Sequence, residues 1–181
     1  AQGDQADQLA GPGDGDDEKP ASGQTTRLID AVRRGGVHRV DAADVGSALA
    51  AVAGTVPDLD AGQRVELLDR LLQRESLSST GLGRGIAVPH PRSPLAGVVT
   101  RPTIPVGFLG RSVDFAAVDG RPVTTLFMLL APSVEVHLAL LSRLAFCLRD
   151  DGFVDLVQRR PTLELLLAAI SGVESRLPPG S

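Results

Sequence analysis

The sequence contains no tryptophan, no tyrosine and only one cysteine. Aromatic residues make up 3% of its 181 residues, so a core has to be built from Leu, Val, Ile and Ala. The scarcity of aromatic side chains argues against a surface that stacks nucleic-acid bases. The net charge of −4 supplies no positive field for a polyanion. The composition therefore predicts that this chain binds no nucleic acid.

The single cysteine, Cys147, excludes an internal disulfide and a cysteine-rich metal site. Its apolar neighbours predict a small core residue. Long hydrophobic runs are also lacking, because Pro132, Glu135, His137 and Arg143 interrupt the most apolar stretch, residues 123–148. No membrane insertion is expected from such a stretch, and the first residues show no signal-peptide pattern. These features favour a cytoplasmic location.

The composition changes sharply near residue 25. Residues 1–24 carry six acidic residues and one lysine, a net charge of −5, among many Gly, Gln and Pro. Such a segment buries too little apolar area to offset its ordering entropy, so it is predicted to be a disordered acidic linker or tail. A tether to an upstream domain and a frayed terminus are both open readings. Residues 25–177 form the predicted domain, and residues 178–181 a short tail.

Helical and strand patterns alternate within the predicted domain. Helices are predicted over residues 25–36, 42–54, 61–75, 134–150 and 161–172. Strands are predicted over residues 37–40, 85–89, 102–110 and 122–131. Asp41 is the expected N-cap of the second helix, and Pro161 occupies the first turn of the last one. The third helix is expected to bury Val65, Leu67, Leu68, Leu71 and Leu72. This alternation predicts an α/β fold with a sheet covered by helices.

Residues 81–92, GLGRGIAVPHPR, place one of only three histidines between Pro89 and Pro91. The prolines hold the ring of His90 in one pose at little further entropic cost. A neutral imidazole is a competent nucleophile near pH 7. His90 is therefore the candidate nucleophile of this chain.

Anion-binding groups surround this histidine in the sequence. Arg74, Arg84 and Arg92 offer guanidinium forks that match pairs of phosphate oxygens. Glycines such as Gly83 allow backbone N–H groups to approach an anion closely. A presented nucleophile among guanidinium groups favours phosphoryl transfer, in which positioning and charge neutralisation dominate.

The stretch QRESLSSTGLGRGIAVPHPR resembles the active-site signature of the fructose/mannitol-type (type 2) enzyme IIA domain of the phosphoenolpyruvate-dependent sugar phosphotransferase system. This family includes nitrogen-regulatory enzyme IIA. The later stretches VDFAAVDGRPVTTLFMLLAP and HLALLSRLAFCLRD resemble the family in order and spacing, so that the likeness covers roughly residues 26–175. The resemblance implies a mixed, mainly five-stranded sheet flanked by helices on both sides. It implies no metal and no bound cofactor.

The resemblance also implies roles for individual residues. His90 would accept a phosphoryl group from a histidine-containing phosphocarrier protein and pass it to a cysteine of an enzyme IIB domain. Arg74 stands at the position of an active-site arginine, and His137 at that of a second, non-phosphorylated histidine. Pro91 departs from the family pattern, which more often has glycine or another small residue after the histidine.

Each of these residues also has a structural interpretation. His137 is alternatively a partly buried histidine on an apolar helix face, and Arg74 a solvated helix end. Thr80 either donates its hydroxyl to the phosphate or only shapes the turn. Arg84 and Arg92 either bind the phosphate or contact the phosphocarrier protein.

Two functions remain open at the level of sequence. One is a phosphotransferase intermediate of sugar transport. The other is a regulatory phosphohistidine module that controls a partner protein or an upstream domain, such as a transcription regulator. The acidic segment at residues 1–24 favours the second, because it suggests a tether.

Overall fold

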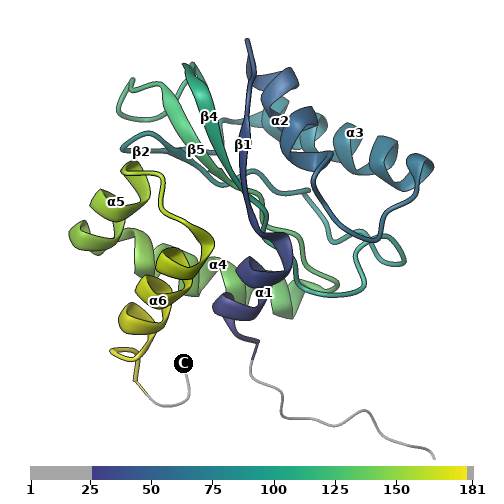
Figure 1. Ribbon diagram of the computed structural model, residues 1–181. Coiled ribbons are helices and arrows are strands. Elements are labelled where there is room, and N and C mark those ends of the chain that lie inside the picture. The colour runs from purple at the N-terminus through teal and green to yellow at the C-terminus, as the bar shows by residue number, and fades with distance from the viewer. Residues whose placement is uncertain (1–25, 179–181) are drawn as a thin grey trace, which may run out of the picture.

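The structure is a computed structural model that describes residues 26–178. The predicted acidic segment 1–24 and residues 179–181 of the predicted tail lie outside this range. Within it, the chain forms a five-stranded mixed β-sheet with helices on both faces (Figure 1). The predicted α/β class and the mixed five-stranded sheet are confirmed.

The sheet has the strand order β1-β4-β5-β3-β2. The strands are β1 (Val37–Val40), β2 (Gly81–Gly83), β3 (Ile86–Ala87), β4 (Val106–Val113) and β5 (Val123–Phe127). Strand β1 runs parallel to β4 and β3 runs parallel to β5, whereas the β4–β5 and β2–β3 pairs are antiparallel. The ends of β3 and β5 therefore lie at the same edge of the sheet.

Three strand predictions had the wrong limits. The strand predicted over residues 122–131 is paired as β5 only at Val123–Phe127, and beyond it Leu130 forms an isolated bridge with Thr103. The strand predicted over residues 102–110 begins only at Val106, because Pro102 and Pro105 have no N–H group to donate to a neighbouring strand. The strand predicted over residues 85–89 is paired as β3 only at Ile86–Ala87, and it forms a tight hairpin with the unpredicted β2.

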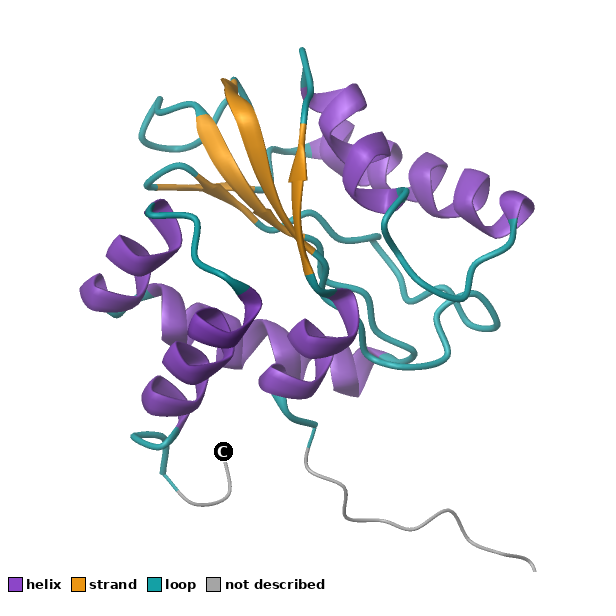
Figure 2. Cartoon of the chain, viewed as in Figure 1, coloured by secondary structure: helices purple, strands orange, loops and turns teal. Residues whose placement is uncertain are grey.

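The helices divide into two groups (Figures 1 and 2). Helices α2 (Val45–Ala53) and α3 (Ala61–Leu77) cover one face of the sheet. Helices α1 (Leu28–Gly35), α4 (Val134–Leu148), α5 (Asp151–Gln158) and α6 (Leu163–Glu174) cover the other. Each face of the sheet has its own hydrophobic core, and successive side chains of β5 and the residues after it point into the two cores in turn. Leu126 and Met128 pack in the core under α2 and α3, whereas Phe127 and Leu129 pack in the core on the other face.

Helix caps correct several predicted boundaries. The N-cap of α2 is Asp44, not Asp41, because the Asp44 carboxylate accepts the N–H of Ser47 at 2.7 Å and the Ser47 hydroxyl accepts the N–H of Asp44. The helix predicted over residues 134–150 ends at Leu148, and Asp150 then caps the separate, unpredicted helix α5. In α6 the cap is Thr162, so the predicted first-turn proline precedes the helix.

The buried face of α3 is narrower than predicted. Leu67 and Leu71 are buried, whereas Val65 and Leu72 are 70% and 40% exposed. At 100° per residue, Val65 and Leu72 both lie about 150° around the helix axis from Leu67. A helix that packs only one face on a sheet therefore leaves them in solvent. The predicted cap, Asp60, is confirmed.

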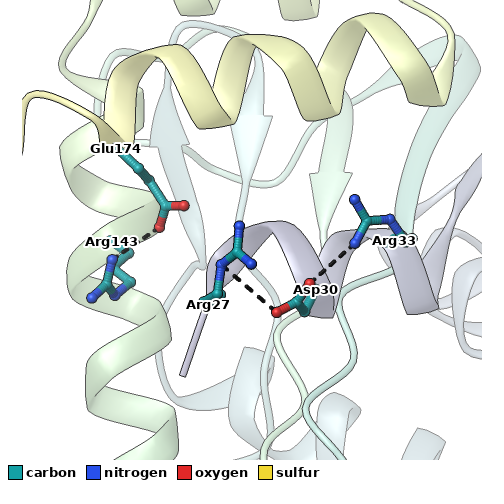
Figure 3. Close-up of polar contacts among 5 residues, drawn as sticks. All are labelled: Arg27, Asp30, Arg33, Arg143 and Glu174. Carbon is teal, nitrogen blue, oxygen red and sulfur yellow. Dashed lines mark hydrogen bonds and ion pairs between the residues drawn. The ribbon is translucent and has the colours of Figure 1, made fainter. Parts of the chain in front are cut away.

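Helix α4 forms a largely buried ion pair with α6. Figure 3 shows Arg143 of α4 pointing toward Glu174 of α6, and the two side chains approach to 3.2 Å. Helix α1 packs on the same side, and its C-terminal Gly35 lies so close to the backbone at Ile104 that a Cβ atom would come within 2.2 Å. The charged residues of α1 drawn in the same figure form exposed i,i+3 pairs through Asp30, which add little stability.

Candidate functional site

His90 lies three residues after Ala87, the last residue of β3. The backbone that leads to it is held on two sides. The N–H of Val88 donates to the Thr80 carbonyl at 3.0 Å, and the N–H of Leu129 donates to the Pro89 carbonyl at 2.9 Å. These two bonds fix the backbone that precedes His90, and the ring itself is half-buried.

One ring nitrogen of His90 is engaged by the backbone. The Nδ1 atom lies 2.8 Å from the carbonyl oxygen of Val88. A carbonyl oxygen only accepts hydrogen bonds, so Nδ1 carries the proton and donates it. In the neutral ring the lone pair then resides on Nε2, which is the nucleophilic atom.

The second predicted histidine lies beside the first. The ring centroids of His90 and His137 are 5.1 Å apart, with the ring planes tilted by 49°. His137 occupies the first turn of α4, where its N–H donates to the carbonyl of Ser133, the N-cap residue. Because α4 begins soon after β5, and β5 runs parallel to β3, the fold brings together two histidines that are distant in sequence.

Both rings titrate below their ordinary range. Burial lowers the pKa of His90, the hydrogen bond to Val88 opposes this, and the nearby Arg74 lowers that pKa further while Glu75 raises it. Burial also lowers the pKa of His137, and the neighbouring His90 ring lowers it further. Neutral imidazoles are therefore favoured near pH 7, which keeps the lone pair of His90 available.

Arg74 and Arg92 line one groove, and Arg92 lies two residues after His90 in the sequence. The groove has a volume of about 540 Å³ and is formed by the last turns of α3 and the loop after His90. Arg74 also donates from Nη1 to the carbonyl of Ser78 at 2.9 Å, which holds its guanidinium at the end of the helix. Arg70 lies in the same groove, and no carboxylate is among the residues that line it. This combination of guanidinium groups can receive an anion, and Arg74 is close enough to His90 to lower the pKa of its ring.

Thr80 lies near His90 but is already engaged. It is buried, and it donates both its N–H and its hydroxyl to the carboxylate of Glu75, at 2.9 and 2.6 Å. The turn-shaping interpretation of Thr80 matches these bonds. Its hydroxyl hydrogen is used by Glu75 in this arrangement.

Gly83 and Arg84 lie at the turn of the β2–β3 hairpin, away from the end that leads to His90. The N–H of Arg84 donates to Asp119 at 2.8 Å, and its guanidinium lies 3.0 Å from Asp151 of α5. Gly83 adopts a φ of 92° in this turn. The structure does not bring these two residues to His90, and their phosphate-binding role stays a prediction.

The sequence interpretation missed two contributors. Glu75 engages Thr80, and the Val88 carbonyl selects the proton position on His90. Only the position of Glu75 next to Arg74 hinted at the first, and a carbonyl leaves no signal in a sequence. Across residues 26–178, no group of three or more His, Cys, Asp or Glu side chains is placed to hold a metal ion. In the same range, no helix has the length and apolar character needed to cross a membrane.

Comparisons with known proteins extend this picture. Residues 37–172 match the family described as "Phosphoenolpyruvate-dependent sugar phosphotransferase system, EIIA 2". A "Nitrogen regulatory protein" of Pseudomonas aeruginosa is 40% identical over 126 residues, which is 68% of this chain and 78% of that protein. A "PTS system fructose-specific EIIA component" of Haloferax volcanii is 40% identical over 99 residues, which is 54% of this chain and 59% of that protein.

A solved structure shares the fold. The complex of enzyme IIAMTL and phosphorylated enzyme IIBMTL from Escherichia coli contains a chain that superposes with a TM-score of 0.60 at 19% identity. The match covers 76% of this chain and 94% of that one. At this identity the likeness establishes a common fold.

Proposed function

Because the chain belongs to the EIIA 2 family of the phosphoenolpyruvate-dependent sugar phosphotransferase system, we propose that His90 is its phosphoryl acceptor. The donor is a histidine-containing phosphocarrier protein, and the next acceptor is a cysteine of an enzyme IIB. The observation that carries this proposal is the histidine pair. Nδ1 of His90 is hydrogen-bonded to the Val88 carbonyl, and the ring centroids of His90 and His137 lie 5.1 Å apart. The related complex of an enzyme IIA with a phosphorylated enzyme IIB supports the choice of acceptor.

The free lone pair determines how the transfer proceeds. The Nε2 lone pair attacks phosphorus and forms an N–P bond, while the P–N bond of the donor phosphohistidine breaks and its electron pair stays on the donor ring. In the second step a cysteine thiolate attacks phosphorus, an S–P bond forms, and the pair of the broken N–P bond returns to Nε2. No proton has to leave Nε2 in either step, because the ring proton stays on Nδ1 at Val88.

Charge compensation during transfer falls to side chains. The transferred group spreads negative charge over its oxygens, and preorganised donors lower its energy most. Arg74 and Arg92 line one groove formed by the end of α3 and the loop after His90, and the ring of His137 lies beside that of His90. We assign phosphate binding to these three residues. The bonds of Thr80 to Glu75 support a positioning role for Thr80.

A regulatory role is the second candidate. The observation that favours it is the relative of Pseudomonas aeruginosa whose name is nitrogen regulatory protein. In this variant of the proposal, phosphorylation of His90 changes a surface that another protein or an upstream domain reads. The same acceptor chemistry serves both roles. The cytoplasmic location stays a prediction from the sequence.

The nucleophile is tested by labelling. Incubation with enzyme I, the phosphocarrier protein and phosphoenolpyruvate should add one phosphoryl group, measured by intact mass, that is labile in acid and stable in base. His90→Ala should abolish labelling and preserve the fold. His38→Ala serves as the control and should label normally. His38 lies on β1, at the opposite edge of the sheet from the β2–β3 hairpin, and its ring is hydrogen-bonded to the carbonyl of Gly35. Full labelling of the His90→Ala protein would show that the acceptor is another residue.

Transport and regulation are separated by the next step. Labelled protein is mixed with an enzyme IIB, and transfer to its cysteine is followed over time. Rapid transfer supports the transport role. Stable label on His90 in the presence of enzyme IIB supports the regulatory one.

A further inference from the structure

Glu75 occupies a position from which it reaches the strand that carries His90. It lies near the end of α3, next to Arg74, and is half-buried. Its two carboxylate oxygens accept both donors of Thr80, the backbone N–H at 2.9 Å and the hydroxyl at 2.6 Å. Bonds of this kind to an ionised acceptor are stronger than neutral ones, and they are strongest where water is excluded. Thr80 is only 3% exposed.

The bond between Glu75 and Thr80 continues to the ring through the backbone. The Thr80 carbonyl accepts the N–H of Val88 at 3.0 Å. The Val88 carbonyl accepts the Nδ1 proton of His90 at 2.8 Å. Three successive hydrogen-bonding steps, linked through the backbone of Thr80 and of Val88, therefore connect the end of α3 to the ring of His90. Because each step involves a different peptide group, they fix the position of the ring and do not relay a proton.

We propose that Glu75 and Thr80 are positioning residues that keep the Val88 carbonyl in place and thereby hold the proton of His90 on Nδ1. This inference rests on the proposed function, because it assigns the pair a purpose in phosphoryl transfer. With the carbonyl in place, Nε2 is the only ring atom with a free lone pair. With the carbonyl displaced, the proton is free to move to Nε2 and block the attacking atom.

Neighbouring residues are anchored by other bonds, so the Glu75–Thr80 contact acts mainly on the backbone at Val88. The preceding residue of the turn is held separately, because the hydroxyl of Ser79 donates to the Phe115 carbonyl and accepts the N–H of Gly81. Pro89 and Pro91 have no N–H of their own to anchor the loop. The carbonyl of Pro89 is anchored separately by the N–H of Leu129, whereas the Thr80–Val88 bond connects this backbone to the end of α3. The carboxylate of Glu75 also raises the pKa of His90, opposite to the effect of Arg74.

The test compares matched variants of the whole chain. Glu75→Gln places an amide donor against the donors of Thr80, and Thr80→Val removes the hydroxyl at nearly constant volume. Thr80→Ser keeps the hydroxyl and should rescue. Glu66→Gln is the charge control, because Glu66 lies exposed on the same helix and has no hydrogen bond or ion pair with any described residue. Each protein is first checked for folding by circular dichroism.

Two readouts are taken on each variant. Proton–nitrogen NMR reports which ring nitrogen of His90 carries the proton, and phosphoramidate, a small phosphoryl donor, reports the labelling rate at Nε2 without any partner protein. We expect Glu75→Gln and Thr80→Val to lose part of the Nδ1–H form and to label about ten- to a hundredfold more slowly, the range typical of lost supporting bonds. Thr80→Ser and Glu66→Gln should match the parent.

A folded Glu75→Gln protein that keeps the Nδ1–H form overturns the proposal, whether or not its labelling slows. If Glu75→Gln does not fold, Thr80→Val decides by the same criterion. The two levels of the argument fail in different ways. If His90 is never phosphorylated in the parent, the proposed function fails, whereas the NMR result still decides whether Glu75 and Thr80 control the ring proton.

Discussion

Phosphorylation of His90 should raise the pKa of His137. In the unmodified protein, burial and the facing ring of His90 both hold the pKa of His137 below its ordinary value. A phosphoryl group on Nε2 adds about two negative charges near neutral pH, by analogy with other phosphorylated side chains. We expect those charges to lie between the two rings, so that the electrostatic influence of position 90 on His137 reverses sign.

The size of the effect follows from the ring separation. The two ring centroids lie 5.1 Å apart. At this separation, one unit charge contributes about 3.3 kcal/mol at an effective dielectric constant of 20 and about 0.8 kcal/mol in bulk water. Two charges therefore correspond to about 1 to 5 pKa units, at 1.36 kcal/mol per unit. Because His137 is only half-buried, solvent screening favours the lower end, and we expect a rise of about 1 to 2 units.

The measurement is an NMR titration of the histidine rings before and after labelling with phosphoramidate. His38 is the internal control, because it lies on β1 at the sheet edge remote from β3 and its signals should stay in place. If the pKa of His137 rises by less than about half a unit, which corresponds to about 0.7 kcal/mol, the reasoning is refuted. It would mean that the phosphoryl group points away from His137 and that this residue contributes only packing.

Two further predictions concern the same site. Arg74→Lys keeps the charge but loses the planar guanidinium fork. Transfer from the phosphocarrier, measured by rapid quench, should slow about ten- to a hundredfold, as expected for the loss of one charge-assisted hydrogen bond of about 1.5–3 kcal/mol. A lysine variant as fast as the parent would show that Arg74 supplies charge alone. The pKa values of His90 and His137 are lower in the folded chain than in the unfolded chain, so the unfolded chain binds protons at a higher pH. The free energy of unfolding should therefore be retained above about pH 6.5 and decline as the pH falls below it. Urea unfolding of the parent and of His90→Gln at several pH values tests this, and an unchanged difference between the two proteins across that range would contradict it.

The class of the fold was predictable because its elements are strongly patterned. Several boundaries were not, and each failure has a local cause. The helix pattern over residues 134–150 continues through Asp150, but in the folded chain α4 ends at Leu148 and Asp150 caps α5. The apolar residues of α3 suggested a wide stripe, but Val65 and Leu72 face solvent because only one side of the helix meets the sheet. Propensity gives the type of an element more readily than its limits.

The site was predictable only in part. The importance of His90 followed from its flanking prolines, whereas the pairing with His137 depended on the family resemblance, because no local pattern predicts that α4 starts next to the end of β3. The glycine-rich hairpin suggested an anion nest, yet the N–H of Arg84 is taken by Asp119, which is distant in sequence. Long-range bonds of this kind are invisible in a single sequence.

The two prolines around His90 have a consequence for charge compensation. Neither Pro89 nor Pro91 has an N–H, so the backbone positions on each side of the nucleophile donate nothing to a phosphoryl group. The Val88 carbonyl holds the Nδ1 proton, and the hydroxyl of Thr80 is committed to Glu75. In the proposed function we therefore expect the donors for the phosphoryl oxygens to be side chains, namely Arg74 and Arg92, which line the groove, and His137 once it is protonated. Under this proposal the backbone fixes the ring of His90, and side chains supply the charge compensation. The geometry of Arg74 should therefore matter more here than in a relative that has glycine after the histidine.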